Sequence, residues 1–286
     1  MISGTTEIIA HIGVPTANFR SPLIYNPWFE QKGIDAVVVP MGCESADYPG
    51  FLRILFNLTN TRGALVTMPH KVTTAGLVDV LSPEAKICGA CNAVRRDGDG
   101  RLVGAMFDGE GFVRAMRSQG RDPHGASALV VGAGGVGSAI AASLAAAGVA
   151  RLALFDLNTA SSEDLARRLA PHHPRLALSC GSADPQGFDI VVNATPLGMK
   201  VEDPLPLDAG RIDAGAYLGD VVMAGRETSL LKAAREKGCA VQPGLDMLFE
   251  QIPAYLEFFG FPEASARELR ELAQPATPTA STRAPL

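Results

Sequence analysis

ALVVGAGGVGSAIAASLAAAG, residues 128–148, is the stretch that decides the fold. Four apolar residues precede glycines at 132, 134 and 137, spaced G-x-G-x-x-G, and an alanine-rich run follows. This order is typical of a strand, a tight turn and a helix whose amino end binds a dinucleotide pyrophosphate. Gly132 permits the turn, Gly134 lets the backbone approach the phosphates, and Gly137 lets the helix pack on the strand. The stretch predicts a nucleotide site formed by Gly132, Ala133, Gly134, Gly135, Val136 and Gly137.

The next apolar strand, 151–156, ends on a carboxylate. Asp156 stands at the distance from the glycines expected of the acidic residue that binds the ribose hydroxyls. It would face the 2′-phosphate of NADP, and two unit charges about 4 Å apart repel by roughly 4 kcal/mol at an effective dielectric constant of about 20. No arginine follows to bind that phosphate, since the next residues are Leu157, Asn158 and Thr159. We expect Asp156 and Asn158 at the cofactor and favour NAD over NADP; the structural alternative is that Asp156 caps the next helix.

Strand and helix patterns alternate along the chain, as in α/β proteins with parallel sheets. Before residue 119, apolar runs at 7–13, 36–39 and 64–67 alternate with helical patterns at 21–32 and 48–58. A hairpin is expected at 92–96 and 102–107, joined by the turn DGDG, and then a helix near 111–118. Beyond residue 126 the expected strands are 128–132, 151–156, 176–179, 189–193 and 217–222, and the last helices are 228–237 and 246–259.

These patterns predict the domain organisation. The fold class is α/β, with an amino-terminal α/β substrate domain, a doubly wound Rossmann dinucleotide-binding domain, and carboxy-terminal helices that pack back on the first domain. The Gly-, Pro- and charge-rich segment 120–126 indicates the linker. The expected boundaries are 1–119 for the substrate-binding and catalytic domain, 120–243 for the Rossmann domain and 244–273 for the returning helices. Residues 274–286 cannot bury a core by their composition, so this tail is expected to be disordered.

Composition limits the partners. The 286 residues carry a formal net charge of -5 and no basic stripe, so a nucleic-acid partner is not expected. The amino terminus lacks a signal-peptide pattern, and the most apolar stretch, 139–155, is broken by Gly148 and Arg151. A cytoplasmic monomer or homodimer without a membrane partner is therefore expected. Cys88 and Cys91 form a lone C-x-x-C with no further ligands at zinc spacing, so we expect buried packing thiols and no metal.

At this point the chain resembles the shikimate/quinate dehydrogenase family, from about residue 12 to residue 251. The resemblance rests on the order and spacing of short motifs. They are GVP at 13–15, SP at 21–22, VTMPHK at 66–71, GACNAV at 89–94, FDGEG at 107–111, NATPLGM at 193–199, and GLDML at 244–248 followed by Gln251. The resemblance implies a nicotinamide-dependent dehydrogenase acting on a small cyclic hydroxy acid.

The resemblance further implies that Lys71 and Asp108 form the catalytic pair. Oxidising a secondary alcohol releases the hydroxyl proton as hydride leaves the same carbon, so a group beside the hydroxyl must accept that proton. A free lysine is protonated at neutral pH and needs desolvation or cationic neighbours to act as a base. Asp108 could instead orient Lys71 and hold the substrate hydroxyl, so the base within the pair stays open. The structural alternative for the pair is an ordinary surface salt bridge.

Other site residues also come from the resemblance. It places at the substrate Ser21, Thr67, Asn92 and Gln251. It places along the cofactor Asn193, Ala194, Thr195, Val221, Gly244 and Met247.

The chain departs from the family where the substrate carboxylate binds. The family usually holds this group with two serines spaced by one residue, but here Phe19 replaces the first and Ser21 is the second. A phenyl ring cannot donate a hydrogen bond, although Arg20 offers a charged fork. Less polar residues than the family commonly has also stand at Leu65, Met106 and Met223. We expect shikimate, bound weakly, or a related and less polar cyclic hydroxy acid; a catalytically silent nucleotide-binding regulatory protein is the alternative from another class.

Overall fold

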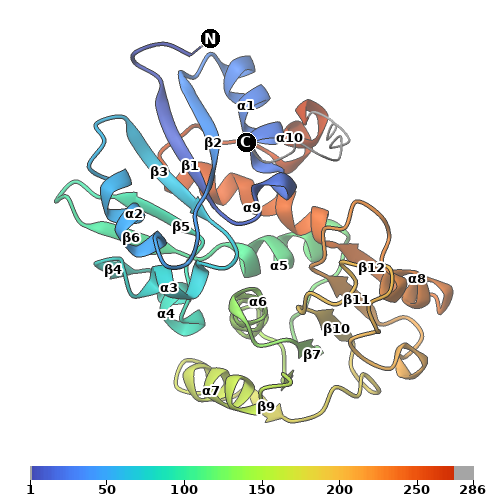
Figure 1. Ribbon diagram of the computed structural model, residues 1–286. Helices are drawn as coiled ribbons and strands as arrows, with labels where there is room; N and C mark the ends of the chain where they lie inside the picture. Colours follow the sequence, from blue (N-terminus) through green and yellow to red (C-terminus); the bar gives the residue numbers. More distant parts are fainter. Residues whose placement is uncertain (1, 274–286) are drawn as a thin grey trace.

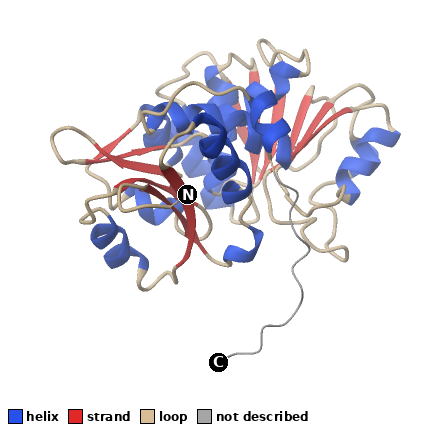
Figure 2. Cartoon of the chain, turned by 90° about the horizontal axis from the view of Figure 1, so that it is seen from above, coloured by secondary structure: helices blue, strands red, loops and turns tan. Residues whose placement is uncertain are grey.

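The computed structural model describes residues 2–273 and contains two six-stranded sheets. Seen from above, the sheets lie on either side of a group of helices (Figure 2). The predicted disordered tail, 274–286, lies outside the described residues. None of the helices in the described part of the chain is both long and apolar enough to cross a membrane.

The first sheet has the order β2-β1-β3-β5-β6-β4. Its strands are β1 (Glu7–Gly13), β2 (Ala36–Gly42), β3 (Thr61–Val66), β4 (Val80–Leu81), β5 (Ala93–Arg96) and β6 (Leu102–Ala105). Its helices are α1 (Ser21–Lys32), α2 (Tyr48–Leu55), α3 (Lys71–Ala75), α4 (Pro83–Cys88) and α5 (Asp108–Ser118). The sheet is mixed rather than parallel throughout, because β5 runs antiparallel to both β3 and β6.

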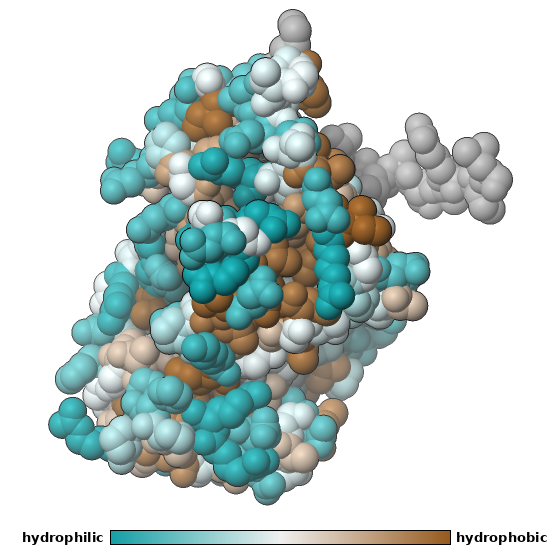
Figure 3. Space-filling model, turned by 90° about the vertical axis from the view of Figure 1, so that its left-hand side faces the viewer, coloured by the Kyte–Doolittle hydropathy of each residue, from teal (hydrophilic) through white to brown (hydrophobic). Residues whose placement is uncertain are grey.

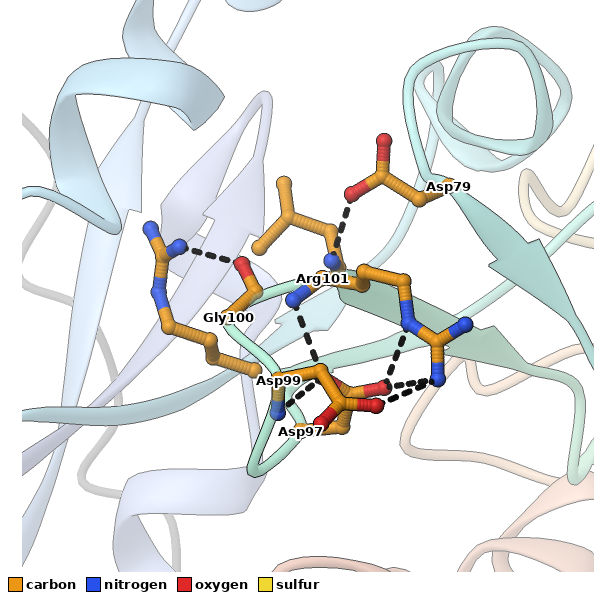
Figure 4. A network of polar contacts seen from close by, with 7 residues as sticks. Asp79, Asp97, Asp99, Gly100 and Arg101 are labelled. Carbon is orange, nitrogen blue, oxygen red and sulfur yellow. Dashed lines mark hydrogen bonds and ion pairs between the residues drawn. The ribbon is translucent and has the colours of Figure 1, made fainter.

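The predicted hairpin is confirmed, and polar contacts close its turn (Figure 4). The guanidinium of Arg101 donates to Asp97 at 3.1 Å and to Asp99 at 3.0 Å. The Asp97 carboxylate also accepts the backbone N–H groups of residues 99 and 101. Asp79, just before β4, accepts the N–H of Leu102 at 2.7 Å and so ties the hairpin to the neighbouring strand. The turn therefore holds β5 and the residues before it in a fixed register beside β3.

The second sheet is parallel throughout, in the order β12-β11-β10-β7-β8-β9. Counted from β7, this is the doubly wound order 6-5-4-1-2-3. Its strands are β7 (Ser127–Val131), β8 (Arg151–Phe155), β9 (Ala177–Cys180), β10 (Ile190–Asn193), β11 (Tyr217–Asp220) and β12 (Ala240–Pro243). Its helices are α6 (Gly135–Ala146), α7 (Thr159–Leu169) and α8 (Ser229–Glu236). The strand order reverses between β7 and β10, and ligands of such sheets bind at this switch point.

The last helices, α9 (Gly244–Phe258) and α10 (Ala266–Leu272), return to the first sheet as predicted (Figure 1). Ile252 and Leu256 of α9 are fully buried in one cluster with Ile9 of β1 and Trp28 of α1. A separate apolar cluster joins α5 and α9 to α6 and to the second sheet. The two halves thus share a packed core, in which α5 and α6 lie side by side. Apolar burial of this kind contributes about 25 cal/mol per Å² removed from water.

Polar side chains cover much of the outer surface. In the face drawn in Figure 3, hydrophilic residues predominate, and hydrophobic ones show between them near the centre of the view. Cys88 and Cys91 are both buried free thiols, as expected.

Candidate active site

Lys71 and Asp108 meet at the boundary of the two halves. Lys71 begins α3, just after β3, and Asp108 begins α5. Lys71 Nζ donates to Asp108 Oδ2 at 2.5 Å, and the two side chains are only 13% and 4% exposed. The amino end of α5 favours the negative charge of Asp108. This is a largely buried ion pair and not the surface salt bridge that was the structural alternative.

Asn92 fixes the second oxygen of the same carboxylate. Its side-chain N–H donates to Asp108 Oδ1 at 2.8 Å, and its own oxygen accepts the backbone N–H of Phe107 at 3.1 Å. Asn92 is 1% exposed and precedes β5. Asp108 is therefore held on both oxygens, which fixes the direction in which it presents Lys71.

A closed set of contacts positions the start of α3. The ring of His70 stacks on Tyr48 with centroids 4.0 Å apart, and its Nε2 lies 2.8 Å from the carbonyl oxygen of Cys43. The hydroxyl of Thr74 donates to the carbonyl of His70 at 2.8 Å and lies 2.6 Å from the Tyr48 hydroxyl. These contacts hold His70 in place. The backbone from which the Lys71 side chain extends is therefore fixed as well.

The pair lies beside the glycine loop. A Cβ added at Gly135 would lie 3.6 Å from Cβ of Lys71 and 3.8 Å from its Cδ. A Cβ at Gly109 would lie only 2.0 Å from the carbonyl oxygen of Ala139, so α5 and α6 touch through their backbones. The amino end of α6, which would receive the phosphates, is therefore adjacent to the lysine stem.

The glycine loop has the geometry that the motif predicts. Gly132 has φ 103°, a conformation that other residues rarely adopt. A Cβ at Gly137 would lie 1.9 Å from the carbonyl oxygen of Gly132, so the turn and the helix are in direct contact. In contrast, a Cβ at Gly134 would have no neighbour within 4 Å. This open space fits the approach of a pyrophosphate to the backbone.

Asp156 already contacts this loop. Its Oδ2 accepts the N–H of Ala133 at 2.7 Å, and its Oδ1 accepts the N–H of Asn158 at 2.9 Å. Asn158 is the exposed N-cap of α7. The carboxylate thus joins the glycine loop to the residue before α7, but it is not the helix cap of the structural alternative, because Asn158 holds the N-cap position and no side chain caps this helix.

The predicted nicotinamide-side residues gather at the end of β10. Asn193, Ala194 and Thr195 follow one another there, and a Cβ at Gly132 would lie 2.8 Å from the carbonyl group of Ala194. Gly244 begins α9 close to Val221, since its Cβ would lie 2.5 Å from that carbonyl oxygen. Met247 is buried one turn further along α9, in the cluster that joins α5 and α6. The four-residue spacing of Met247 and Gln251 places both on one face of this helix.

Known proteins with the same organisation identify the family. A family model described as "Shikimate dehydrogenase substrate binding domain" matches residues 12–94, and a model of the ThiF family matches residues 119–173. The shikimate dehydrogenase (NADP(+)) of Rubrobacter xylanophilus is 38% identical over 254 residues, covering 87% of this chain and 89% of that protein. This chain belongs to the shikimate dehydrogenase family. A further relative, the shikimate dehydrogenase (NADP(+)) of Acidiphilium cryptum, is 36% identical and covers 91% of this chain and 93% of that protein.

Solved structures of the family agree in fold. The shikimate 5-dehydrogenase of Listeria monocytogenes, in complex with shikimate and NAD, matches with a TM-score of 0.86 at 29% identity, covering 95% of this chain and 97% of that one. The quinate dehydrogenase of Corynebacterium glutamicum, in complex with NAD, matches with a TM-score of 0.84 at 30% identity, covering 93% and 98%.

The remaining predicted substrate residues of this shikimate dehydrogenase family member lie on three different elements. Ser21 is the first residue of α1 and is buried. Thr67 follows β3 beside Gly13, whose Cβ would lie 2.5 Å from Thr67 Cγ2. Gln251 of α9 packs on α5 at Gly111, and its Oε1 is buried without a hydrogen-bond partner among the described residues. An unpartnered buried acceptor is costly, and a substrate hydroxyl would satisfy it.

Two functional candidates were missed from the sequence. Asp220 at the end of β11 is 1% exposed and accepts from Thr228 at 2.6 Å and from Asn193 at 3.0 Å. Burial raises the pKa of Asp220, while the three donors Thr228, Val222 and Asn193 oppose that rise. This network fixes the loop after β11. Of its residues, only Asn193 belongs to a motif that the sequence analysis had singled out. The second candidate, His11 of β1, appears in the sequence as one polar residue inside an apolar strand.

No cluster of three or more His, Cys, Asp or Glu side chains within residues 2–273 is arranged to hold a metal ion.

Proposed function

We propose that this chain transfers hydride between a nicotinamide cofactor and a secondary alcohol of shikimate or a related cyclic hydroxy acid. The observation that carries the proposal is the contact of the buried Lys71–Asp108 pair with the amino end of α6. The proton-transfer groups of one half thereby lie next to the nucleotide-binding turn of the other. Family membership and the named relatives make the chain an NAD(P)-dependent oxidoreductase.

The chain's own residues supply binding and proton transfer. When bound, the nicotinamide ring takes or returns the hydride. Gly132, Gly134 and Gly137 shape the turn for the pyrophosphate, and the free N–H groups at the start of α6 bind it. In alcohol oxidation the neutral amine of Lys71 takes the hydroxyl proton and becomes the ammonium, and in the reverse reaction the ammonium returns that proton, while Asp108 and Asn92 keep the lysine in place. The alternative, in which Asp108 takes the proton and Lys71 stabilises the alkoxide, uses the same contacts.

Substrate binding is assigned to residues around the pair. Ser21, Thr67, Asn92 and Gln251 bind the hydroxyl and carboxylate groups of the ring. The unpartnered Oε1 of Gln251 supports its place in this set. A catalytically silent regulatory protein is disfavoured, because the buried ion pair is kept with both partners intact. Cytoplasmic location, a monomeric or homodimeric state and the expected domain boundaries stay predictions.

The wild-type chain tests this proposal directly. We expect reduced nicotinamide, followed by its absorbance, to form when shikimate, quinate and related cyclic hydroxy acids are supplied with NAD or with NADP. Absence of reduction with every alcohol, by a chain that binds the cofactor, would favour the regulatory alternative.

For the cofactor we propose a preference for NAD. The Asp156 carboxylate already lies against the N–H of Ala133 in the glycine loop, so it would meet the adenosine ribose of a bound cofactor. The curated relatives are named for NADP(+), whereas the Listeria monocytogenes and Corynebacterium glutamicum structures hold NAD. Both cofactors therefore occur among the proteins that this chain resembles, and the charge of Asp156 is the argument for NAD.

Replacing Asp156 by asparagine should raise the efficiency with NADP relative to NAD. We expect the ratio of the two kcat/KM values to shift toward NADP by about ten-fold or more, because the repulsion of the 2′-phosphate is removed. The matched control is Glu163→Gln, which removes an exposed carboxylate from α7 away from the loop and should leave the ratio unchanged. A wild-type chain that already prefers NADP would contradict the role given to Asp156.

A further inference from the structure

His11 of the first sheet and Phe19, just before α1, form a stacked pair. His11 lies on β1, in register with Leu65 of β3. Its imidazole lies nearly parallel to the ring of Phe19, with centroids 4.0 Å apart and an interplanar angle of 20°. Burial, and then the nearby charge of Lys71, lower the pKa of His11 to about 3. The imidazole is therefore neutral at physiological pH and lies within electrostatic reach of the catalytic lysine.

The ring nitrogens of His11 have no hydrogen-bond partner among the described residues. His11 is 9% exposed, and its Nδ1 is enclosed without a hydrogen-bond partner among residues 2–273. Enclosed N–H groups without acceptors are rarer than enclosed lone pairs without donors, so the ring proton belongs on Nε2. Nε2 also forms no hydrogen bond within the described chain, and unlike Nδ1 it is not fully enclosed. The ring thus has one N–H donor free for a ligand.

Phe19 and Leu65 make the surroundings of this donor apolar. The tip of the Phe19 ring, Cζ, would lie 3.2 Å from a Cβ at Gly13, on the side where that Cβ would meet Thr67. Leu65 is buried directly opposite His11 on the neighbouring strand. The ammonium of Lys71 is already paired with Asp108 at 2.5 Å. A carboxylate placed here would lose its hydration to a phenyl ring, and neutral donors such as the hydroxyls of Ser21 and Thr67 and one imidazole N–H would replace that hydration only in part.

We propose that the His11–Phe19 pair determines substrate class, by selecting cyclic alcohols whose ring substituent at this wall is an uncharged planar carbonyl group, such as an ester or an amide. The carbonyl oxygen of that group accepts Nε2–H of His11 in the plane of the imidazole, and the group packs against the edge of the phenyl ring. This inference rests on the proposed function, because it concerns the substituent side of the same substrate site. In this inference His11 selects the substrate by donating a hydrogen bond. Phe19 contributes a packing contact, and does more than remove the serine hydroxyl.

The test compares shikimate with its methyl ester, using the full-length chain and one cofactor. We expect kcat/KM to be at least about ten-fold higher for the ester, the size of effect that a charged group loses when its hydrogen bonds are not replaced. Phe19→Ser restores a hydroxyl and removes the stack, and it should shift the ratio toward the free acid by about ten-fold or more. The matched control Phe19→Leu supplies no hydroxyl but also removes the stack, so it should keep a preference for the ester that is weaker than in the wild-type chain.

His11 has its own readout. His11→Leu should lower kcat/KM for the ester several-fold through loss of a neutral hydrogen bond, while His11→Gln, which keeps a side-chain N–H, should retain most of it. Thermal unfolding of each variant shows that the fold is kept.

Three results would overturn the inference. A wild-type preference for the free acid does so while leaving the proposed function intact. Equal shifts of the ester-to-acid ratio in Phe19→Ser and Phe19→Leu do so as well. If neither compound is oxidised with NAD or NADP, the inference falls together with the proposed function.

Discussion

Replacement of Lys71 by alanine is expected to lower kcat by about 10²-fold or more, the usual effect of removing a positioned acid–base group. Cofactor binding should be nearly unchanged, because the phosphates and ribose are held by the glycine loop and Asp156. The measurement is steady-state kinetics together with direct cofactor titration. The control is Lys86→Ala, which removes an exposed lysine from the next helix, α4, and should leave kcat unchanged.

A second variant separates proton transfer from charge. Lys71→Arg keeps a cation beside Asp108, but an arginine does not give up its proton in proteins. If Lys71 transfers the proton, the arginine variant should be impaired nearly as severely as the alanine variant. Near-normal turnover of Lys71→Arg would show that the residue acts only as a charge, and near-normal turnover of Lys71→Ala would make the pair structural.

Replacement of Gly109 by alanine should have the largest effect on stability. The added Cβ would lie 2.0 Å from the carbonyl oxygen of Ala139 and 2.4 Å from the hydroxyl of Ser143, so α5 and α6 would have to move apart. Overpacking of this kind costs about 1–3 kcal/mol, and the backbone contact places this site at the upper end. Because Gly109 follows Asp108, the shift should also lower kcat. Denaturant unfolding and activity assays measure the two effects.

The matched control is another helical glycine. Gly50 lies in α2, and a Cβ there would have no neighbour within 4 Å. Alanine has the higher helix propensity, so Gly50→Ala should stabilise the chain by about 0.5–1 kcal/mol. If both substitutions changed the unfolding free energy alike, the backbone contact between α5 and α6 would not be what joins the two halves.

The sequence predicted long, strongly patterned elements well. The bounds expected for 7–13 and 21–32 are those of β1 and α1, because an apolar run ends at Gly13 and a helical pattern ends at Gly33, which caps α1 in the left-handed conformation. The Rossmann order followed from the glycine motif and the βα alternation. The helix expected at 48–58 ends earlier, at Leu55.

Four of the short elements gave no usable signal. Helices α3, α4 and α10 have five to seven residues each, too few to establish a helical period. Strand β12 is four residues long, lies at the sheet edge and is only partly buried, so its apolar pattern is weak. The first sheet is mixed because the hairpin of β5 and β6 enters between β3 and β4, and strand order is not encoded locally.

Part of the candidate site could be predicted from sequence motifs, and part depends on the fold. The family resemblance paired Lys71 with Asp108 and gave Asn92 to the substrate, and the structure adds that Asn92 donates to the Asp108 carboxylate. The stack of His11 on Phe19 could not be expected, because the two residues lie on different segments and only the fold brings their rings together. The replacement of a family serine by Phe19 was visible in the sequence, but the stacking of Phe19 on His11 was not.

The central claim is that the Lys71–Asp108 pair and the nicotinamide ring act on one carbon atom. A crystal structure of the full chain with NAD and a slowly reacting cyclic alcohol tests it most directly. We expect the reacting hydroxyl oxygen within about 3 Å of Lys71 Nζ or the Asp108 carboxylate, and its carbon about 3–3.5 Å from C4 of the nicotinamide. An alcohol bound away from this pair, or a nicotinamide ring turned from it toward solvent, would contradict the account.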